Sequence, residues 1–219
     1  MFRFNKNINK ENKQNKFIRQ QAGMTYIELI VVLSIFSVMT SVVLFNYDKF
    51  QAKVDIKNLA NDVALKIVEA QKSALSGKLP TQLFGADWRP SYGVYFDLSS
   101  SFGDNKKFIY FTDLDQSGNY NDGSFCPSSG GTYECLDKIS ITKNNYISDI
   151  TVFYNDGSLS TSLSGSNLAI TFARPNSEAI FASTTAFSAS VSDVQITIIS
   201  PSGMTAKIKV YVSGRIQIN

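Results

Sequence analysis

The spacing of hydrophobic positions changes twice along the chain. Residues 5–21 are polar, rich in Asn, Lys and Gln, and lack an apolar period, which indicates a solvated and mostly disordered arm. Residues 29–45 then form a run without charge, Gly or Pro, and residues 24–27 extend it. A helix needs about 20 apolar residues to cross about 30 Å of hydrocarbon. The pattern therefore predicts a membrane-spanning helix over residues 24–45.

The segment 46–76 predicts an amphipathic stem that continues this helix. Its apolar residues recur at steps of three to five, which is typical of a helix with one buried stripe: Phe50, Val54, Leu59, Val63, Ile67, Ala70 and Ala74. Residues 24–76 contain no Gly or Pro, and Gly77 supplies a stop signal. We therefore expect one continuous helix over 24–76.

From Leu79 onward the hydrophobic period becomes two, which predicts strands. The segments are rich in Val, Ile, Phe, Tyr and Thr and cover 93–98, 107–112, 139–142, 147–154, 168–173, 179–182, 194–199, 207–212 and 215–218. Asn155-Asp156-Gly157 and Ser213-Gly214 between them are typical of hairpin turns. The expected class is α+β, with a long N-terminal helix and an extracytoplasmic antiparallel β-domain over 77–219, either a β-sandwich or a sheet packed on the stem.

The amino-acid composition excludes several classes of catalytic and metal-binding site. The chain has no His and two Cys, which removes Ser-His, Cys-His and histidine-metal sites and leaves no Cys-only zinc site. Residues 1–23 carry six basic residues against one acidic residue, whereas the remainder carries 15 basic and 17 acidic residues. The basic character thus belongs to the first segment, which argues against DNA as a partner and leaves DNA binding as an alternative. A positive strip formed by several cations would favour it: Lys106, Lys107, Lys207, Lys209 and Arg215.

Glu28 lies inside the apolar run, and two interpretations of it are open. A carboxylate in lipid costs several kcal/mol unless neutralised or paired, and such residues are usually functional. Alternatively, Glu28 lies at the membrane surface and starts the helix, where its charge suits the helix dipole. Positive charge before the run predicts a cytoplasmic N-terminus and an exported C-terminal domain. An ordinary secretory signal, with a short apolar core and a small-x-small cleavage site, fits poorly.

Residues Gly23-Met24-Thr25-Tyr26-Ile27-Glu28-Leu29, after a basic leader and before an apolar run, closely resemble the class III signal of type IV prepilins and pseudopilins. The resemblance implies that a prepilin peptidase cleaves between Gly23 and Met24, that the new N-terminal Met24 is methylated, and that Glu28 guides assembly. Met24 stands where Phe is usual in the family.

The resemblance also implies partners and location. These are the prepilin peptidase, other pilin or pseudopilin subunits bound through the N-terminal helix, an inner-membrane assembly platform, and the lipid bilayer. The subunit would span the cytoplasmic membrane once and reach a pilus or the cell surface after assembly. Phe45 stands where many filament-forming pilins have Pro, which favours a minor subunit.

The C-terminal half resembles the H-type minor pseudopilins in the order of several short segments. These are Tyr92-Gly93-Val94-Tyr95-Phe96, Phe111-Thr112-Asp113-Leu114-Asp115, Ile170-Thr171-Phe172 and Val212-Ser213-Gly214-Arg215-Ile216. The resemblance supports a minor pilin or pseudopilin rather than a major filament subunit.

Residues 113–122 have oxygen donors at alternating positions and a Gly at the sixth, like the first half of a calcium loop. The candidate ligands are Asp113, Asp115, Ser117, Asn119, Asn121 and Asp122. Ser124 occupies the position where a bidentate Glu is expected. The alternatives are a weak calcium site, with Ca²⁺ as the only cofactor considered, and a polar loop in which Asp and Asn serve turn chemistry.

Cys126 and Cys135 flank a segment rich in Pro, Ser and Gly, and export would favour a disulfide between them. Free buried thiols are the alternative. The closed loop would stabilise the fold by about 2.5–3 kcal/mol on the chain-entropy model.

The sequence therefore predicts a non-enzymatic, membrane-anchored subunit that functions by assembly. Two other functions stay open. One is a ligand-binding tip subunit for DNA uptake or adhesion, and the other is a signal-anchored extracytoplasmic enzyme that uses a pair of Asp or Glu residues. No carboxylate pair stands out for the enzyme, and it leaves Glu28 unexplained.

Overall fold

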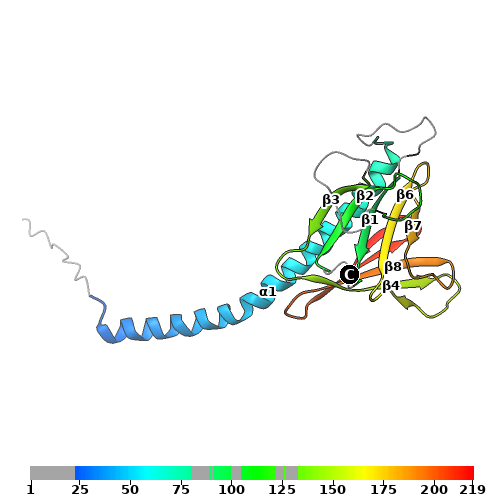
Figure 1. Ribbon diagram of the computed structural model, residues 1–219. Helices are drawn as coiled ribbons and strands as arrows, with labels where there is room; N and C mark the ends of the chain where they lie inside the picture. The colour runs from blue at the N-terminus through cyan, green and yellow to red at the C-terminus, as the bar shows by residue number, and fades with distance from the viewer. Residues whose placement is uncertain (1–22, 80–88, 90, 100–104, 122–125, 127–132) are drawn as a thin grey trace, which may run out of the picture. The chain divides into compact units, whose positions relative to one another are not determined.

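The computed structural model describes residues 23–79, 89, 91–99, 105–121, 126 and 133–219. Within these residues the chain forms one helix followed by ten strands, so the α+β class is confirmed (Figure 1). The predicted arm over 5–21 and the candidate ligand Asp122 lie outside the described residues.

Helix α1 spans Tyr26–Leu75, 50 residues, which confirms the prediction of one continuous helix. No Gly or Pro interrupts it, so no backbone bond of the helix is lost to either residue. At its end Gly77 has φ +66°, and its N–H donates to the carbonyl of Ala74 at 3.1 Å while Lys78 N–H donates to Ser73 at 3.2 Å. These two bonds make a Schellman motif, which explains why the helix ends at this glycine.

Contacts within the chain divide it into Met1–Phe45 and Asn46–Asn219. The described side chains before residue 46 are all exposed. In the second unit the stem buries one stripe, which includes Val63, Ile67, Ala70 and Ala74 as predicted. Phe50 was expected in this stripe, and that prediction was wrong because its side chain is 65% exposed. The buried stripe begins six residues later, at Ile56.

The second unit contains two five-stranded antiparallel sheets. The first has the order β3-β2-β1-β6-β7, and the second has the order β10-β9-β8-β4-β5. The strand bounds are β1 Ser91–Asp97, β2 Lys107–Thr112, β3 Cys135–Ser140, β4 Tyr146–Tyr154, β5 Thr161–Ser162, β6 Asn167–Ala173, β7 Ala179–Ala182, β8 Val191–Ile199, β9 Thr205–Tyr211 and β10 Ile216–Ile218.

One hydrophobic core joins the stem to both sheets. The stem supplies Ile56, Val63 and Ile67 to a cluster that also contains Phe96 of β1 and Ile196 of β8. Alternate residues of β9 and β8 point into this core, as expected for strands with one buried face. Helix and sheets are therefore held together by shared burial within residues 56–210.

Most strands fall where the alternation predicted them, and two do not. The strand expected over 139–142 begins instead at Cys135 and ends at Ser140, because residues 135–140 pair with β2 through a register shift at Tyr110/Phe111. Strand β5, Thr161–Ser162, was not predicted, since two polar residues carry no alternation. Both expected turns contain a glycine with positive φ, Gly157 at +74° and Gly214 at +79°.

Candidate functional site

Gly23, Met24 and Thr25 precede the helix, and Glu28 lies in its first turn. The backbone N–H of Glu28 donates to Thr25 Oγ1 at 3.4 Å, and that of Leu29 donates to the Thr25 carbonyl at 3.1 Å. Thr25 is therefore the N-cap, and Glu28 occupies the third helical position, where a negative charge suits the dipole. This geometry is compatible with both interpretations of Glu28, the helix-start role and the assembly role.

The side chains that follow Glu28 make a long exposed apolar surface. Large hydrophobic residues on this surface include Ile30, Leu33, Phe36, Val43 and Phe45, each at least 42% exposed. Exposed apolar surfaces of this extent mark sites of contact with lipid or with other protein surfaces. By length and composition, the helix is long and apolar enough to cross a membrane.

A second candidate is the acidic loop between β2 and β3. Carboxylate oxygens of Asp113, Asp115 and Glu134 all lie within 4.8 Å of one another. Asp113 and Asp115 were predicted as candidate ligands, whereas Glu134 was not. The position of Glu134 directly before Cys135 could have indicated it as a ligand. Strand β3 pairs with β2, and this pairing brings Glu134 beside the start of the loop.

Two carboxylates of this loop accept hydrogen bonds from the backbone N–H groups of the loop itself. Asp113 accepts the N–H groups of Ser117 and Gly118, each at 3.0 Å, and Glu134 accepts those of Leu114 at 3.2 Å and Asn121 at 2.8 Å. Both side chains are buried, at 2% and 5% exposure. The two carboxylates therefore hold the loop against the end of β2.

Burial makes these carboxyl groups harder to ionise. Desolvation raises the pKa of Asp113 to about 6 and that of Glu134 to about 7, and the charges of neighbouring carboxylates add to both shifts. Desolvation also opposes ionisation of Asp115, but hydrogen bonds from Ser117 and Asn121 lower its pKa overall. The loop thus holds one ionised carboxylate beside two groups that protonate near neutral pH.

The other predicted calcium ligands show a mixed arrangement. Asn121 donates its side-chain amide to Asp115 at 2.7 Å and to Ser117 Oγ at 3.1 Å, so its nitrogen faces the carboxylates. Asn119 Oδ1 is buried without a hydrogen-bond partner among the described residues. A cation would need oxygen in place of the Asn121 nitrogen. The hydrogen bonds therefore account for this loop as a turn, and calcium stays a prediction.

The same loop covers the outer face of the first sheet. Tyr120 packs its ring against Tyr95 at 5.0 Å and Phe111 at 5.3 Å between centroids, within a second small hydrophobic cluster. Cys126 and Cys135 form a disulfide at the edge of this cluster, with Cα atoms 5.2 Å apart. Strand β1 is consequently buried on both faces.

The five cations considered for DNA come from different sheets. Lys207 and Lys209 lie on β9 and Arg215 precedes β10, whereas Lys107 begins β2 of the other sheet. Lys209 Nζ pairs with Asp193 at 3.0 Å and lies 4.6 Å from the centre of the Phe153 ring. Lys209 thus serves contacts within its own sheet, and no observation in the described residues favours the DNA alternative.

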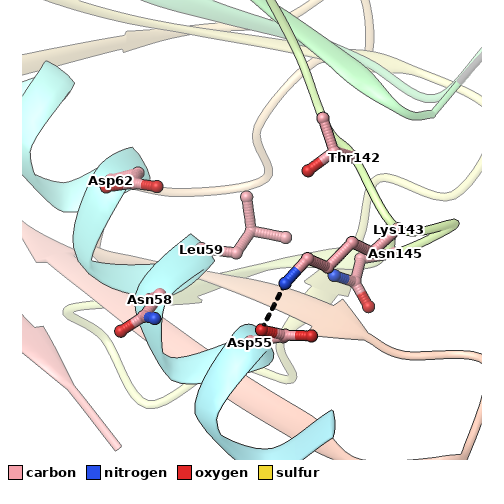
Figure 2. A pocket seen from close by; sticks show the side chains of 7 residues that line it. All are labelled: Asp55, Asn58, Leu59, Asp62, Thr142, Lys143 and Asn145. Atoms are coloured by element: carbon pink, nitrogen blue, oxygen red, sulfur yellow. Dashed lines mark hydrogen bonds and ion pairs between the residues drawn. The ribbon is translucent and has the colours of Figure 1, made fainter. Parts of the chain in front are cut away.

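A polar pocket lies between the stem and the turn that connects β3 to β4. Figure 2 shows Asp55, Asn58 and Asp62 on the helix, with Lys143 reaching across from the turn. Lys143 Nζ and Asp55 Oδ1 are 2.6 Å apart, and this hydrogen bond lowers the pKa of Asp55. Lys143 and Asn144 both have φ +58°, as a type I′ turn requires. Sequence reasoning missed this contact.

Comparison with family models, with curated proteins and with solved structures found no match to this chain.

Proposed function

We propose that this chain is a minor type IV pilin or type II secretion pseudopilin, a subunit that assembles through α1 into a pilus or pseudopilus. The observation that carries the proposal is an exposed apolar helix that begins at Tyr26, three residues after Gly23, and has Glu28 in its first turn. The same helix continues without a break into a stem that shares one hydrophobic core with the two sheets, within the unit Asn46–Asn219. The two units thus match a division into anchor and displayed domain.

Processing would create the charge that assembly uses. Cleavage after Gly23 removes six basic residues and one acidic residue and leaves a free amine on Met24. In lipid, the Glu28 carboxylate and this amine are both costly when unpaired. In a filament, the Glu28 carboxylate of one subunit can pair with the Met24 amine of its neighbour, so that each charge gains a partner. Such pairing would fix the axial offset between adjacent helices. Methylation of Met24 keeps its positive charge.

The proposal places the N-terminus in the cytoplasm and the β-unit outside, since the basic residues lie before the apolar segment. A prepilin peptidase and an inner-membrane assembly platform are then the partners that process and extrude the subunit. Inward-facing residues of both sheets share one core, which supports a β-sandwich as the form of the displayed unit. The role that we propose for this subunit is assembly and not catalysis.

Intact-mass measurement of the chain purified from membranes of a host with a prepilin peptidase tests the proposal. The expected chain begins at Met24 and carries one added methyl group. Gly23→Val should leave the leader in place, whereas Ser34→Val, in the exposed part of the same helix, should be processed normally. A wild-type chain that keeps residues 1–23 in assembled filaments would contradict the proposal.

A further inference from the structure

The polar pocket of Figure 2 is formed by two segments that are far apart in the sequence, the stem and the turn before β4. Its volume is about 170 Å³, and six of its seven lining residues are polar: Asp55, Asn58, Leu59 and Asp62 from the stem, and Thr142, Lys143 and Asn145 from the turn. Ligand pockets are usually lined mainly by apolar side chains, so this lining indicates a hydrophilic occupant.

Four of these side chains make no hydrogen bond or ion pair within the part of the chain that the structure describes: Asn58, Asp62, Thr142 and Asn145. Three of them are exposed, but Asn145 is only 4% exposed. Buried polar groups nearly always have a hydrogen-bond partner, and Asn145 also lines the pocket. Its amide therefore requires a partner that occupies the pocket, either water or a ligand.

An ion pair holds the two sides of the pocket together. Asp55 Oδ1 accepts hydrogen bonds from Lys143 Nζ at 2.6 Å and from Gln51 Nε2 at 2.8 Å. The backbone N–H of Asn145 donates to the carbonyl oxygen of Thr142 at 3.2 Å and closes the turn. The polar groups of the turn are thus held in place before a ligand arrives, which reduces the entropy that binding costs.

The charges of the lining favour an uncharged ligand. An anion would lie beside the carboxylates of Asp55 and Asp62, whereas an organic cation would lie beside the ammonium group of Lys143. A calcium ion prefers several carboxylate oxygens, and Asp55 is already paired with Lys143. The two asparagine amides and the threonine hydroxyl each offer both a donor and an acceptor. A neutral molecule with several hydroxyl groups fits this combination.

We propose that the pocket binds one ring of a neutral saccharide. Hydroxyl groups of the ring donate to Asp62 and to the amide oxygens of Asn58 and Asn145, and they accept hydrogen bonds from the amide nitrogens. Leu59 supplies apolar contact for the C–H groups of the ring. The volume lies below the roughly 300–1,000 Å³ of pockets for drug-sized molecules, which limits the occupant to about one ring. One chain forms the whole site, so the inference goes beyond assembly and does not depend on it.

The adjoining groove extends the pocket along the stem. It shares Asp55, Lys143 and Asn145 with the pocket, continues to Ser200 and Ser202, and has a volume of about 240 Å³. The hydroxyl oxygens of Ser200 and Ser202 lie 2.9 Å apart and add further donors and acceptors. Because the two spaces meet at three shared residues, a second ring joined to the first can lie in the groove.

Saturation-transfer NMR on the full-length chain tests the proposal. The chain is held in a zwitterionic detergent, because a detergent with a sugar headgroup would compete for the site. The probes are glucose, galactose, mannose and N-acetylglucosamine, with methylammonium chloride and inorganic phosphate as charged alternatives. At least one sugar should give saturable transfer, and its homodisaccharide should bind at least about threefold more tightly through the groove.

Two asparagines on the same helix give a matched pair of variants. Asn58→Ala should weaken sugar binding at least about tenfold, because the amide lines the pocket. Asn61→Ala should leave the affinity unchanged, since Asn61 is also exposed but lines a different groove, with Met204 and Ile218. Asn145→Ala should abolish binding, with thermal unfolding as the check that it folds. Asn58→Ala keeps the test valid if the buried substitution disrupts the fold.

A change of charge distinguishes a sugar from a cation. Asp62→Asn keeps an oxygen acceptor and removes the charge, so sugar affinity should fall less than about threefold, whereas a bound cation would lose about tenfold. The absence of saturable transfer from every sugar would overturn the proposal, and so would equal effects of Asn58→Ala and Asn61→Ala. Binding of methylammonium or phosphate that is lost in Asn58→Ala would assign the pocket to a charged ligand instead. A homodisaccharide that binds no more tightly than its monosaccharide would overturn the role given to the groove.

Discussion

Gln71 on the stem donates its side-chain amide to the carbonyl oxygen of Gly214, at 3.3 Å, in the turn between β9 and β10. The same nitrogen also lies 3.0 Å from the carbonyl oxygen of Ser177. One amide thus ties the end of the stem to two loops of the β-unit. A Cβ on Gly214 would lie 2.3 Å from Gln71 Nε2 and 2.2 Å from the Ser177 oxygen, so the close approach requires glycine.

Gly214→Ala should therefore destabilise the β-unit by about 2–3 kcal/mol, from strain at φ +79° and from displacement of Gln71 and Ser177. Gly157→Ala is the matched control, because Gly157 has φ +74° but nothing within 4 Å of a built Cβ. It should cost only about 1 kcal/mol. Urea unfolding of the 46–219 fragment, which contains the whole core, measures both. Equal losses for the two variants would show that the contact with Gln71 contributes nothing.

The division of the fold into helix and strands was predictable because it follows from local periodicity. The helix has no Gly or Pro, and strands such as β2 and β6 carry dense β-branched and aromatic residues. Strand β3 was misplaced because its sequence, CLDKIS, lacks a clear alternation, and its position is set by pairing with β2. Phe50 was misassigned because periodicity shows which face is apolar and not where the partner surface begins.

Two of the three carboxylates clustered at the acidic loop were predictable from local sequence. Asp113 and Asp115 belong to a recognisable local pattern, whereas Glu134 reaches them only through strand pairing. Lys143 meets Asp55 from 88 positions away in the sequence, so no local spacing could indicate that contact. The motif around Gly23 and Glu28 is entirely local, which is why sequence alone supports the functional proposal there.

The disulfide should contribute measurable stability. The Cys126→Ser/Cys135→Ser variant should lose about 2.5–3 kcal/mol, because closing the ten-residue loop restricts the unfolded chain. Unfolding of the variant and of wild type, each with and without reductant, gives the difference. Reductant should destabilise wild type and leave the double variant unchanged. Non-reducing peptide mapping that finds no Cys126–Cys135 peptide in exported protein would contradict the assignment.

The stability of the β-unit should fall as pH rises from about 4 to about 7. The pKa values of Asp113 and Glu134 in the folded protein are about 6 and about 7, above their ordinary values of 3.8 and 4.5. In this window the folded state binds more protons than the unfolded state, so raising the pH favours unfolding, by an amount on the order of 5 kcal/mol.

Urea unfolding of the fragment at several pH values measures this slope. Glu134→Gln should roughly halve it, because one titrating group and its repulsion on Asp113 are removed. Glu178→Gln, at an exposed carboxylate, is the control and should leave the slope unchanged. Stability that rises from pH 4 to pH 7 in wild type would show that the two carboxyl groups are not strained by burial.

Calcium should produce little binding heat at this loop. Asp113 and Glu134 already accept backbone N–H groups, and the Asn121 amide nitrogen faces the carboxylates. Isothermal titration of the fragment with millimolar calcium chloride is the direct measurement, with Asp115→Asn as the control for heat from this cluster. Saturable heat that disappears in Asp115→Asn would establish a calcium site and contradict the expectation.

Replacement of Glu28 should separate membrane insertion from assembly. Glu28→Leu lengthens the apolar segment, so insertion should persist or improve, and cleavage after Gly23 should persist because the glycine and the apolar run are unchanged. Incorporation into filaments should fall at least tenfold, since the partner for the Met24 amine of the neighbouring subunit is gone. Ser34→Leu is the matched control, because it adds the same side chain to the exposed part of the helix without removing a carboxylate.

Filaments are sheared from cells with equal membrane levels of each variant, and the subunit is quantified by immunoblot. If Glu28→Leu enters filaments as well as Ser34→Leu does, the carboxylate does not guide assembly. Its remaining role would then be the one seen beside Thr25, at the start of the helix.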